Sequence, residues 1–159
     1  MTAQNINYLL TCARQKLADS PSAGIDSEVL LAHVLDTGRS FLYANPELEL
    51  PHQRLTAFKR LVKRRAKGEP VAYLTGCCEF WSLPLEVNPA VLIPRPETEL
   101  LVEMALQKIP SGASWRIADL GTGSGAIALA LGSECRRCEI HATDISRKAL
   151  KLAQFNANK

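Results

Sequence analysis

The chain has 159 residues, which suffice for one ordinary domain or two small ones. Its content of 47% apolar and 22% charged residues is typical of a globular protein with enough material for a core. A net charge of +3 is too small to indicate nucleic acid as a partner, and we expect no direct sequence-specific contact with it. No apolar run is long enough to span a bilayer, and the first five residues lack the basic start of a signal peptide. We therefore expect a cytoplasmic protein that does not enter the membrane.

The five cysteines show no spacing typical of a metal site. Cys135 and Cys138 form a single C-x-x-C pair, and the sequence contains no second pair of this kind. We expect free thiols in a reducing compartment and no bound metal.

The first 68 residues carry helical patterns. Apolar residues at positions 6–17 recur at helical spacing and predict a first helix. A second helix is expected to begin near Asp26 and to end by Gly38, because glycine suits the position after a helix end. A third helix is expected after Pro51. Residues 1–68 should therefore form a small helical domain.

The third helix would carry one basic face. The cationic residues on that face are Arg54, Lys59, Arg60, Lys63, Arg64, Arg65 and Lys67. Such a run is usually a solvated surface. The alternative interpretation is that it docks to an acidic or ribosomal surface.

The pattern changes to β-type residues after the helical domain. Residues 69–92 are expected to form a β-hairpin linker with its turn at residues 82–84, which confines Pro84 to the turn or to an edge. Residues 93–99 then have the sequence Ile-Pro-Arg-Pro-Glu-Thr-Glu, in which two prolines fix an extended backbone at the start of a helix. Arg95 is held between these prolines. That placement suits a side chain that must be aimed, although an ordinary surface arginine is the alternative.

A glycine-rich loop at residues 119–125 follows a short apolar strand and precedes an alanine-rich helix. Such turns bind ligands in α/β sheets because residues without Cβ let a ligand approach the backbone, and the helix start offers unpaired N–H groups. Gly121, Gly123 and Ala126 satisfy the looser dinucleotide pattern G-x-G-x-x-A, so an NAD site stays open as an alternative. Asp119, two residues before the first glycine, favours a cationic ligand over a pyrophosphate.

The next expected strand ends in a second acidic residue. Asp144 lies 23 residues after Gly121, near the roughly 20-residue spacing at which a strand-end carboxylate binds a ribose. The pattern D-x-G-x-G-x-G, which begins at Asp119, resembles the first motif of class I methyltransferases that depend on S-adenosylmethionine. S-adenosylmethionine and NAD both contain a ribose, so Asp144 indicates a nucleoside ligand without choosing between them. We expect an α/β fold in which residues 93–159 form the first part of a Rossmann-like methyltransferase sheet, with only two strands.

Five segments spread over nearly the whole chain carry a closer resemblance. They are residues 64–65 (Arg-Arg), 68–76 (Gly-Glu-Pro-Val-Ala-Tyr-Leu-Thr-Gly), 79–81 (Glu-Phe-Trp), 91–99 and 119–128. Together they resemble the HemK/PrmC family of release factor glutamine methyltransferases. The Ile-Pro-Arg-Pro-Glu-Thr-Glu segment is the specific one, because the glycine loop alone would indicate only a methyltransferase.

The resemblance implies transfer of a methyl group from S-adenosylmethionine to a glutamine side-chain amide nitrogen. The glutamine is that of the Gly-Gly-Gln motif in class 1 peptide chain release factors, so the reaction would modulate translation termination. Residues 1–68 would recognise the release factor, with ribosome association as a further possibility. By position in the family motifs, Asp119 would lie near the amino end of the cofactor and Asp144 would bind its ribose. The loop residues that contact the cofactor would be Gly121, Thr122, Gly123, Ser124 and Gly125. Arg95, Pro96 and Glu97 would line the active site near the methyl group.

The family's catalytic Asn-Pro-Pro-Tyr motif is absent from this sequence. In the family this motif follows a later strand and supplies acceptors that hold the amide N–H groups, while Asn88-Pro89 stands in the wrong place for it. We therefore expect the N-terminal portion of such an enzyme, without its catalytic Asn. The alternatives are a glutamine methyltransferase acting on a ribosomal protein, an amino-group methyltransferase acting on nucleic acid, and a non-catalytic module that binds a release factor or the ribosome.

Overall fold

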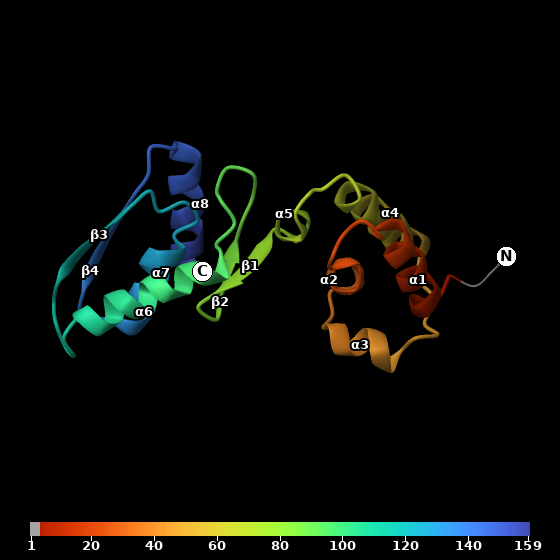
Figure 1. Cartoon of the computed structure of the whole chain (residues 1–159), viewed down its shortest axis with the longest axis horizontal. Helices are drawn as coiled ribbons and strands as arrows, with labels where there is room; N and C mark the ends of the chain where they lie inside the picture. Colours follow the sequence, from red (N-terminus) through yellow and green to blue (C-terminus); the bar gives the residue numbers. More distant parts are fainter. Residues whose placement is uncertain (1–3) are drawn as a thin grey trace. The chain divides into compact units, whose positions relative to one another are not determined.

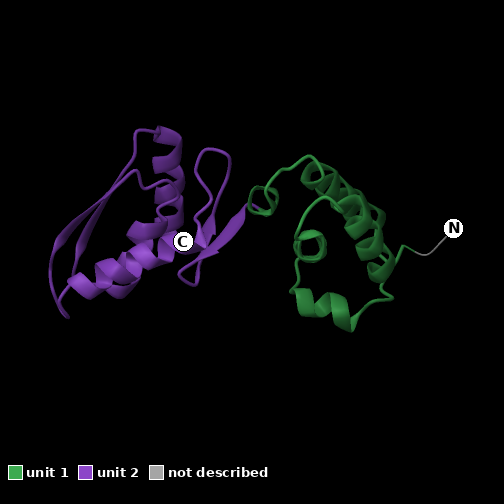
Figure 2. Ribbon diagram, in the orientation of Figure 1, with its two compact units in different colours: residues 1–75 green, residues 76–159 purple. Residues whose placement is uncertain are grey.

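The computed structural model describes residues 4–159 and divides them into two compact units (Figure 2). The first unit reaches Thr75, and the second begins at Gly76. The hairpin that was expected as a linker in residues 69–92 thus begins with the second unit, whereas the residues before it belong to the first.

The first unit consists of helices (Figure 1). They are α1 (Ile6–Lys16), α2 (Ala23–Leu35), α3 (Arg39–Ala44), α4 (His52–Arg65) and α5 (Val71–Thr75). Their apolar faces meet in one core, whose most deeply buried side chains include Ile6, Leu30, Leu31, Leu42 and Phe58. The three helices expected from the apolar spacing are all present.

Two local expectations for this unit are wrong. The residue that follows α2 in the left-handed conformation is Asp36, with φ of 57°, and not Gly38. Aspartate tolerates this region better than most residues with a side chain. The β-type pattern after Pro70 is helical instead, because the Pro70 carbonyl accepts hydrogen bonds from the N–H groups of Tyr73 and Leu74. Leu74 is buried in the core of the first unit, so packing decides the local structure.

Two buried carboxylates on α2 are paired with arginines. Arg65 Nε lies 2.8 Å from Asp26 Oδ2, and Arg14 and Arg39 donate to opposite oxygens of Glu28 at 2.9 and 2.6 Å. These ion pairs matter for stability, because a buried carboxylate that loses its partner would strongly destabilise the folded state. Arg65 is therefore a structural residue and does not belong to the solvated basic face of α4, where the sequence pattern placed it.

The second unit opens with an antiparallel hairpin of β1 (Cys77–Phe80) and β2 (Leu83–Glu86). Its turn is formed by Trp81 and Ser82, with φ of 53° and 57°, so the turn lies before the position expected at residues 82–84. Positive φ at both central residues matches the twist of a two-residue hairpin. Pro84 lies in β2, and the hairpin has only two strands, so Pro84 is on an edge strand as expected.

The rest of the second unit alternates helices and strands. The elements are the 3-10 turn η1 (Pro96–Thr98), α6 (Glu99–Lys108), β3 (Arg116–Leu120), α7 (Ala126–Glu134), β4 (Glu139–Thr143) and α8 (Arg147–Asn158). The two strands pair in parallel, with Arg116 opposite Glu139 and Leu120 opposite Thr143. Figure 1 shows α6, α7 and α8 on one side of this pair.

The core of the second unit includes residues of the hairpin. Phe80 and Leu85 from the hairpin pack in one buried cluster with Val102 of α6 and Leu131 of α7. The hairpin is thus an integral part of this unit. The α/β fold and its two parallel strands confirm the fold class expected from the sequence.

Within residues 4–159, none of the helices combines the length and apolar character that spanning a bilayer needs. All five cysteines are free thiols.

Candidate functional site

The glycine loop after β3 uses backbone geometry that only glycine adopts easily. Gly121, Gly123 and Gly125 have φ of 80°, 57° and 86°. Most residues with a side chain are strained in this left-handed region. The three glycines therefore allow the chain to turn from the end of β3 directly into α7.

The start of the loop is bonded to the end of the neighbouring strand. The N–H groups of Gly121 and Thr122 both donate to the carbonyl oxygen of Thr143, at 2.8 Å each. The Thr122 hydroxyl donates to Asp119 Oδ2 at 2.6 Å. Parallel pairing of β3 and β4 thus brings the ends of both strands to the same edge of the sheet. Asp119, at the loop end of β3, and Asp144, directly after β4, both lie at this edge.

The glycines differ in what surrounds them. A Cβ on Gly125 would lie 3.2 Å from Cβ of Ala153, so this glycine allows α7 to approach α8 closely. A Cβ on Gly121 or Gly123 would meet no atom within 4 Å. The first two glycines therefore leave open space beside the backbone, where a ligand has room, while the third serves packing inside the protein.

Asp144 is bonded to the loop by its carboxylate. Its Oδ2 accepts from the Gly123 N–H at 2.9 Å, and its Oδ1 accepts from the Ser146 N–H at 2.8 Å. The hydrogen bonds from Ser146 and Gly123 hold the pKa of Asp144 below its ordinary value. The carboxylate is thus kept charged, and its remaining lone pairs can accept hydroxyl donors from a ribose.

One residue that sequence reasoning missed is connected to this loop. Asn156 of α8 is buried, and its amide donates to the carbonyl oxygens of Ser124 and Glu86. Its partners lie 32 and 70 residues away along the chain. The available signal was the position of Asn156 at helical spacing after Ala149 and Ala153, which puts it on the buried side of α8, where an amide needs partners.

Arg95, Pro96 and Glu97 lie before α6 and are exposed to solvent. Arg95 has an extended backbone, with φ of −96° and ψ of 143°, as the flanking prolines predict. In the part of the chain that the structure describes, none of the three forms a hydrogen bond or an ion pair with the glycine loop. Their role at the active site stays a prediction.

The segment after these residues is anchored to the hairpin turn. Glu99 Oε1 accepts from the backbone N–H of Trp81 at 2.8 Å, and the Trp81 indole N–H donates to Glu134 Oε1 at 2.8 Å. These two carboxylates hold the unusual turn conformation of Trp81. The hairpin is thereby fixed against α6 and α7.

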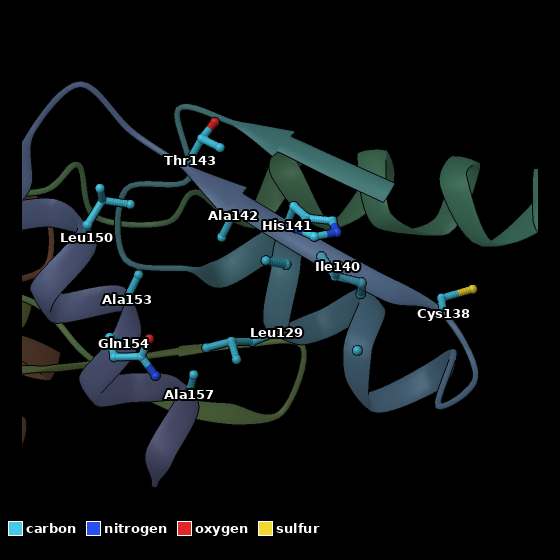
Figure 3. A pocket seen from close by; sticks show the side chains of 12 residues that line it. Leu129, Cys138, Ile140, His141, Ala142, Thr143, Leu150, Ala153, Gln154 and Ala157 are labelled. Atoms are coloured by element: carbon cyan, nitrogen blue, oxygen red, sulfur yellow. The ribbon is translucent and has the colours of Figure 1, made fainter. Parts of the chain in front are cut away.

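A cavity of about 690 Å³ lies elsewhere in the second unit, between α7, β4 and α8 (Figure 3). Leu129, Ile140 and Leu150 contribute apolar side chains to its wall. None of the residues that the sequence singled out as site residues lines this cavity, so we attribute no part of the site to it.

The geometry as a whole places an open glycine loop beside two carboxylates. An open glycine loop at a strand-to-helix turn offers close backbone approach, and a charged carboxylate stands at the end of the adjacent parallel strand. Asp119 adds a second carboxylate beside the loop, which suits a ligand with a cationic group. The fold is that of the first part of a class I methyltransferase domain.

Comparison with known proteins agrees with this class. Residues 8–76 match the PrmC N-terminal domain, and residues 96–159 match the methyltransferase small domain. A release factor glutamine methyltransferase of Coxiella burnetii is 50% identical over 154 residues, which are 97% of this chain and 53% of that protein. Proteins of the same name from Escherichia coli and Xylella fastidiosa are 52% and 45% identical, over 91% and 94% of this chain and 52% and 53% of their own length.

These matches confirm the resemblance to the PrmC family seen in the sequence. The chain spans about half the length of the curated relatives that it matches.

Proposed function

We propose that this chain contributes the cofactor loop and the substrate-recognition domain to a glutamine methyltransferase. The methyl donor is S-adenosylmethionine, and the acceptor is the side-chain amide nitrogen of the glutamine in the Gly-Gly-Gln motif of class 1 peptide chain release factors. The observation that carries the proposal is the open glycine loop joined to Asp144, in a chain about half identical to proteins named for this activity. Modulation of translation termination in the cytoplasm follows from that substrate.

The loop and its two acids have separate parts in cofactor binding. The backbone of residues 121–125 forms the cradle, and the open sides of Gly121 and Gly123 give the cofactor its room. Asp144 accepts the ribose hydroxyls, since its carboxylate is held in place by two backbone N–H groups. Asp119 attracts the cationic amino end of the cofactor.

The reaction itself requires alignment more than acid–base chemistry. The bound cofactor supplies a methyl group on a cationic sulfur. The amide nitrogen is a poor nucleophile because its lone pair is delocalised into the carbonyl, so the enzyme must hold it in line with the methyl group. Arg95, Pro96 and Glu97 would line the path of the entering glutamine. The family's Asn-Pro-Pro-Tyr acceptors are not in this chain, so the chain alone should bind the cofactor without transferring the methyl group.

The first unit would hold the release factor. Support comes from the exposed cationic side chains of α4, which include Lys59, Arg60 and Lys63. Arg54 and Arg60, with His33 of α2, line a hollow of about 460 Å³ in this unit. An acidic protein surface complements such a face, and release factor binding should then weaken as salt is added.

A chimera tests the proposed function. The chain would be continued after Lys159 with the corresponding second half of the Escherichia coli relative, and incubated with S-adenosylmethionine and a class 1 release factor. Mass spectrometry should find one methyl group on the glutamine of Gly-Gly-Gln. The same chimera with Gly123→Ala should transfer far less, because the added Cβ occupies the open space beside the loop.

Other outcomes would overturn the proposal. A folded chimera that methylates a ribosomal protein or nucleic acid but not the release factor would assign a different substrate. A folded chimera that binds a release factor and transfers no methyl group to any acceptor would favour a non-catalytic binding module.

A further inference from the structure

Asn156 makes three hydrogen bonds from a buried position near the end of α8. Its Oδ1 accepts from the Glu86 N–H at 2.8 Å, and its Nδ2 donates to the Glu86 carbonyl oxygen at 3.0 Å. The same Nδ2 donates to the Ser124 carbonyl oxygen at 2.9 Å. Both N–H donors of Nδ2 are therefore used, and the residue is 8% exposed.

The amide group acts toward β2 as a neighbouring strand would. It pairs with both the N–H and the carbonyl of Glu86, which is the last residue of β2. A side chain that offers one acceptor and two donors is required for this pattern, and asparagine supplies them at this length. The outer edge of the hairpin is thereby joined to α8.

The third bond carries this connection to the glycine loop. Ser124 lies between Gly123 and Gly125, and it is 2% exposed, so its carbonyl oxygen depends on a protein partner. Asn156 provides that partner. Three segments far apart in the sequence, which are β2, the glycine loop and α8, thus meet at one side-chain amide.

We propose that Asn156 is a positioning residue that fixes the glycine loop in its cofactor-binding shape. This inference rests on the proposed function for its consequence, because a fixed loop binds the cofactor without first being ordered. Asn156 need not touch the cofactor. It acts by holding the Ser124 carbonyl while the neighbouring Gly123 N–H stays bonded to Asp144.

Asn156→Asp is the informative substitution, because it keeps the size and the acceptor oxygen and removes both donors. Its carboxylate would face the carbonyl oxygens of Ser124 and Glu86. Asn158→Asp is the matched control, since Asn158 is an exposed residue of the same helix.

Amide hydrogen exchange of the 159-residue chain, read residue by residue, tests the positioning directly. In Asn156→Asp we expect exchange of the Gly123 and Gly125 N–H groups to rise by about tenfold or more, and exchange within β3 and α6 to stay unchanged. In the same variant, the affinity for S-adenosylmethionine should fall by about tenfold. Asn158→Asp should behave as the unmodified chain does in both measurements.

A uniform rise in exchange throughout the second unit would show a purely structural role and overturn the inference. Unchanged exchange of the loop would overturn it as well. If the unmodified chain fails to bind S-adenosylmethionine, the proposed function fails, yet the exchange of the loop still decides whether Asn156 holds it.

A measurement on the unmodified chain covers the case in which Asn156→Asp does not fold. The two side-chain N–H protons of Asn156 should exchange slowly with solvent, because both are bonded to buried carbonyl oxygens. Side-chain protons that exchange as fast as those of exposed Asn158 would contradict the proposal.

Discussion

The backbone N–H of Gly123 donates a 2.9 Å hydrogen bond to Oδ2 of Asp144. The loop after one strand and the acid after the next are therefore joined before any ligand enters. Parallel pairing of β3 and β4 places these two residues together although they are 21 positions apart in the chain. The candidate cofactor site is thus already assembled by the elements that this chain contains.

Replacing Gly123 should weaken cofactor binding with little loss of stability. In Gly123→Ala the new Cβ enters the open space beside the loop, and we expect the affinity for S-adenosylmethionine to fall at least about tenfold, equivalent to 1.4 kcal/mol. Titration followed by nuclear magnetic resonance would measure it. Gly132→Ala is the control, because Gly132 lies in α7 and its added Cβ would make only an ordinary contact at 3.7 Å with Ile140. Equal affinity of the two variants would contradict the assignment of the loop.

Gly125→Ala should instead destabilise the second unit. The residue has φ of 86°, and its new Cβ would lie 3.2 Å from Cβ of Ala153. We expect a loss of about 3 kcal/mol in the free energy of unfolding, from backbone strain and overpacking together. Gly121→Ala should lose only about 1 kcal/mol, since it carries the strain without the contact.

Urea unfolding followed by tryptophan fluorescence measures this difference. Both tryptophans, Trp81 and Trp115, lie in the second unit. A loss for Gly121→Ala as large as that for Gly125→Ala would show that strain alone decides, and that close packing of α7 on α8 does not.

The local part of the site was predictable from the sequence. Glycine spacing, the apolar strand before it and Asp144 after the next strand all act within one strand–helix–strand unit, and the structure has that unit at the expected residues. Asn156 was not predictable as part of the loop, because its partners are distant in sequence and only the packed fold brings them near. The left-handed conformation of Trp81 was not predictable for the same reason, because its hydrogen-bond partners Glu99 and Glu134 lie in α6 and α7.

In the first unit too, local patterns were predictable from the sequence, whereas features that depend on packing were not. Apolar spacing gave α1, α2 and α4, because each has a face that must be buried. The short α5 was missed, since its β-type residues are held in a helix by burial of Leu74. Arg65 was misplaced for a related reason: a run of basic residues does not reveal which of them faces a buried carboxylate.

Asp144 should make the stability of the second unit depend on pH at acidic values. Hydrogen bonds from Ser146 and Gly123 lower its pKa in the folded state. The stabilisation is therefore present above the pKa of the unfolded chain, about 3.9, and is lost as the pH falls through the lower folded-state value. Asp144→Asn should lose less stability than the unmodified chain between neutral pH and about pH 3.

Urea unfolding followed by tryptophan fluorescence at a series of pH values checks this dependence. Asp19→Asn, which removes an exposed carboxylate from the first unit, is the control and should leave the pH dependence of the second unit unchanged. Parallel pH curves for Asp144→Asn and the unmodified chain would exclude the role of these hydrogen bonds.

Removing Arg65 should destabilise the first unit far more than removing a neighbouring cation. Arg65→Met leaves Asp26 buried without its ion pair, and we expect a loss of about 3 kcal/mol. Lys63→Met, on the exposed side of the same helix, should change the free energy of unfolding by no more than about 0.5 kcal/mol. Tyrosine fluorescence can follow this unit, because all three tyrosines lie in it. Similar losses for both variants would contradict the structural role of the pair.

The loop from Asp119 to Gly125 is the proposed S-adenosylmethionine site. Proton–nitrogen correlation spectra of the 159-residue chain, recorded during separate titrations with S-adenosylmethionine and NADH, test it most directly. We predict that S-adenosylmethionine shifts the N–H signals of Gly121, Gly123 and Ser146, and that NADH does not. Shifts of these signals by NADH alone, or by neither ligand at any concentration reached, would contradict the proposed S-adenosylmethionine site.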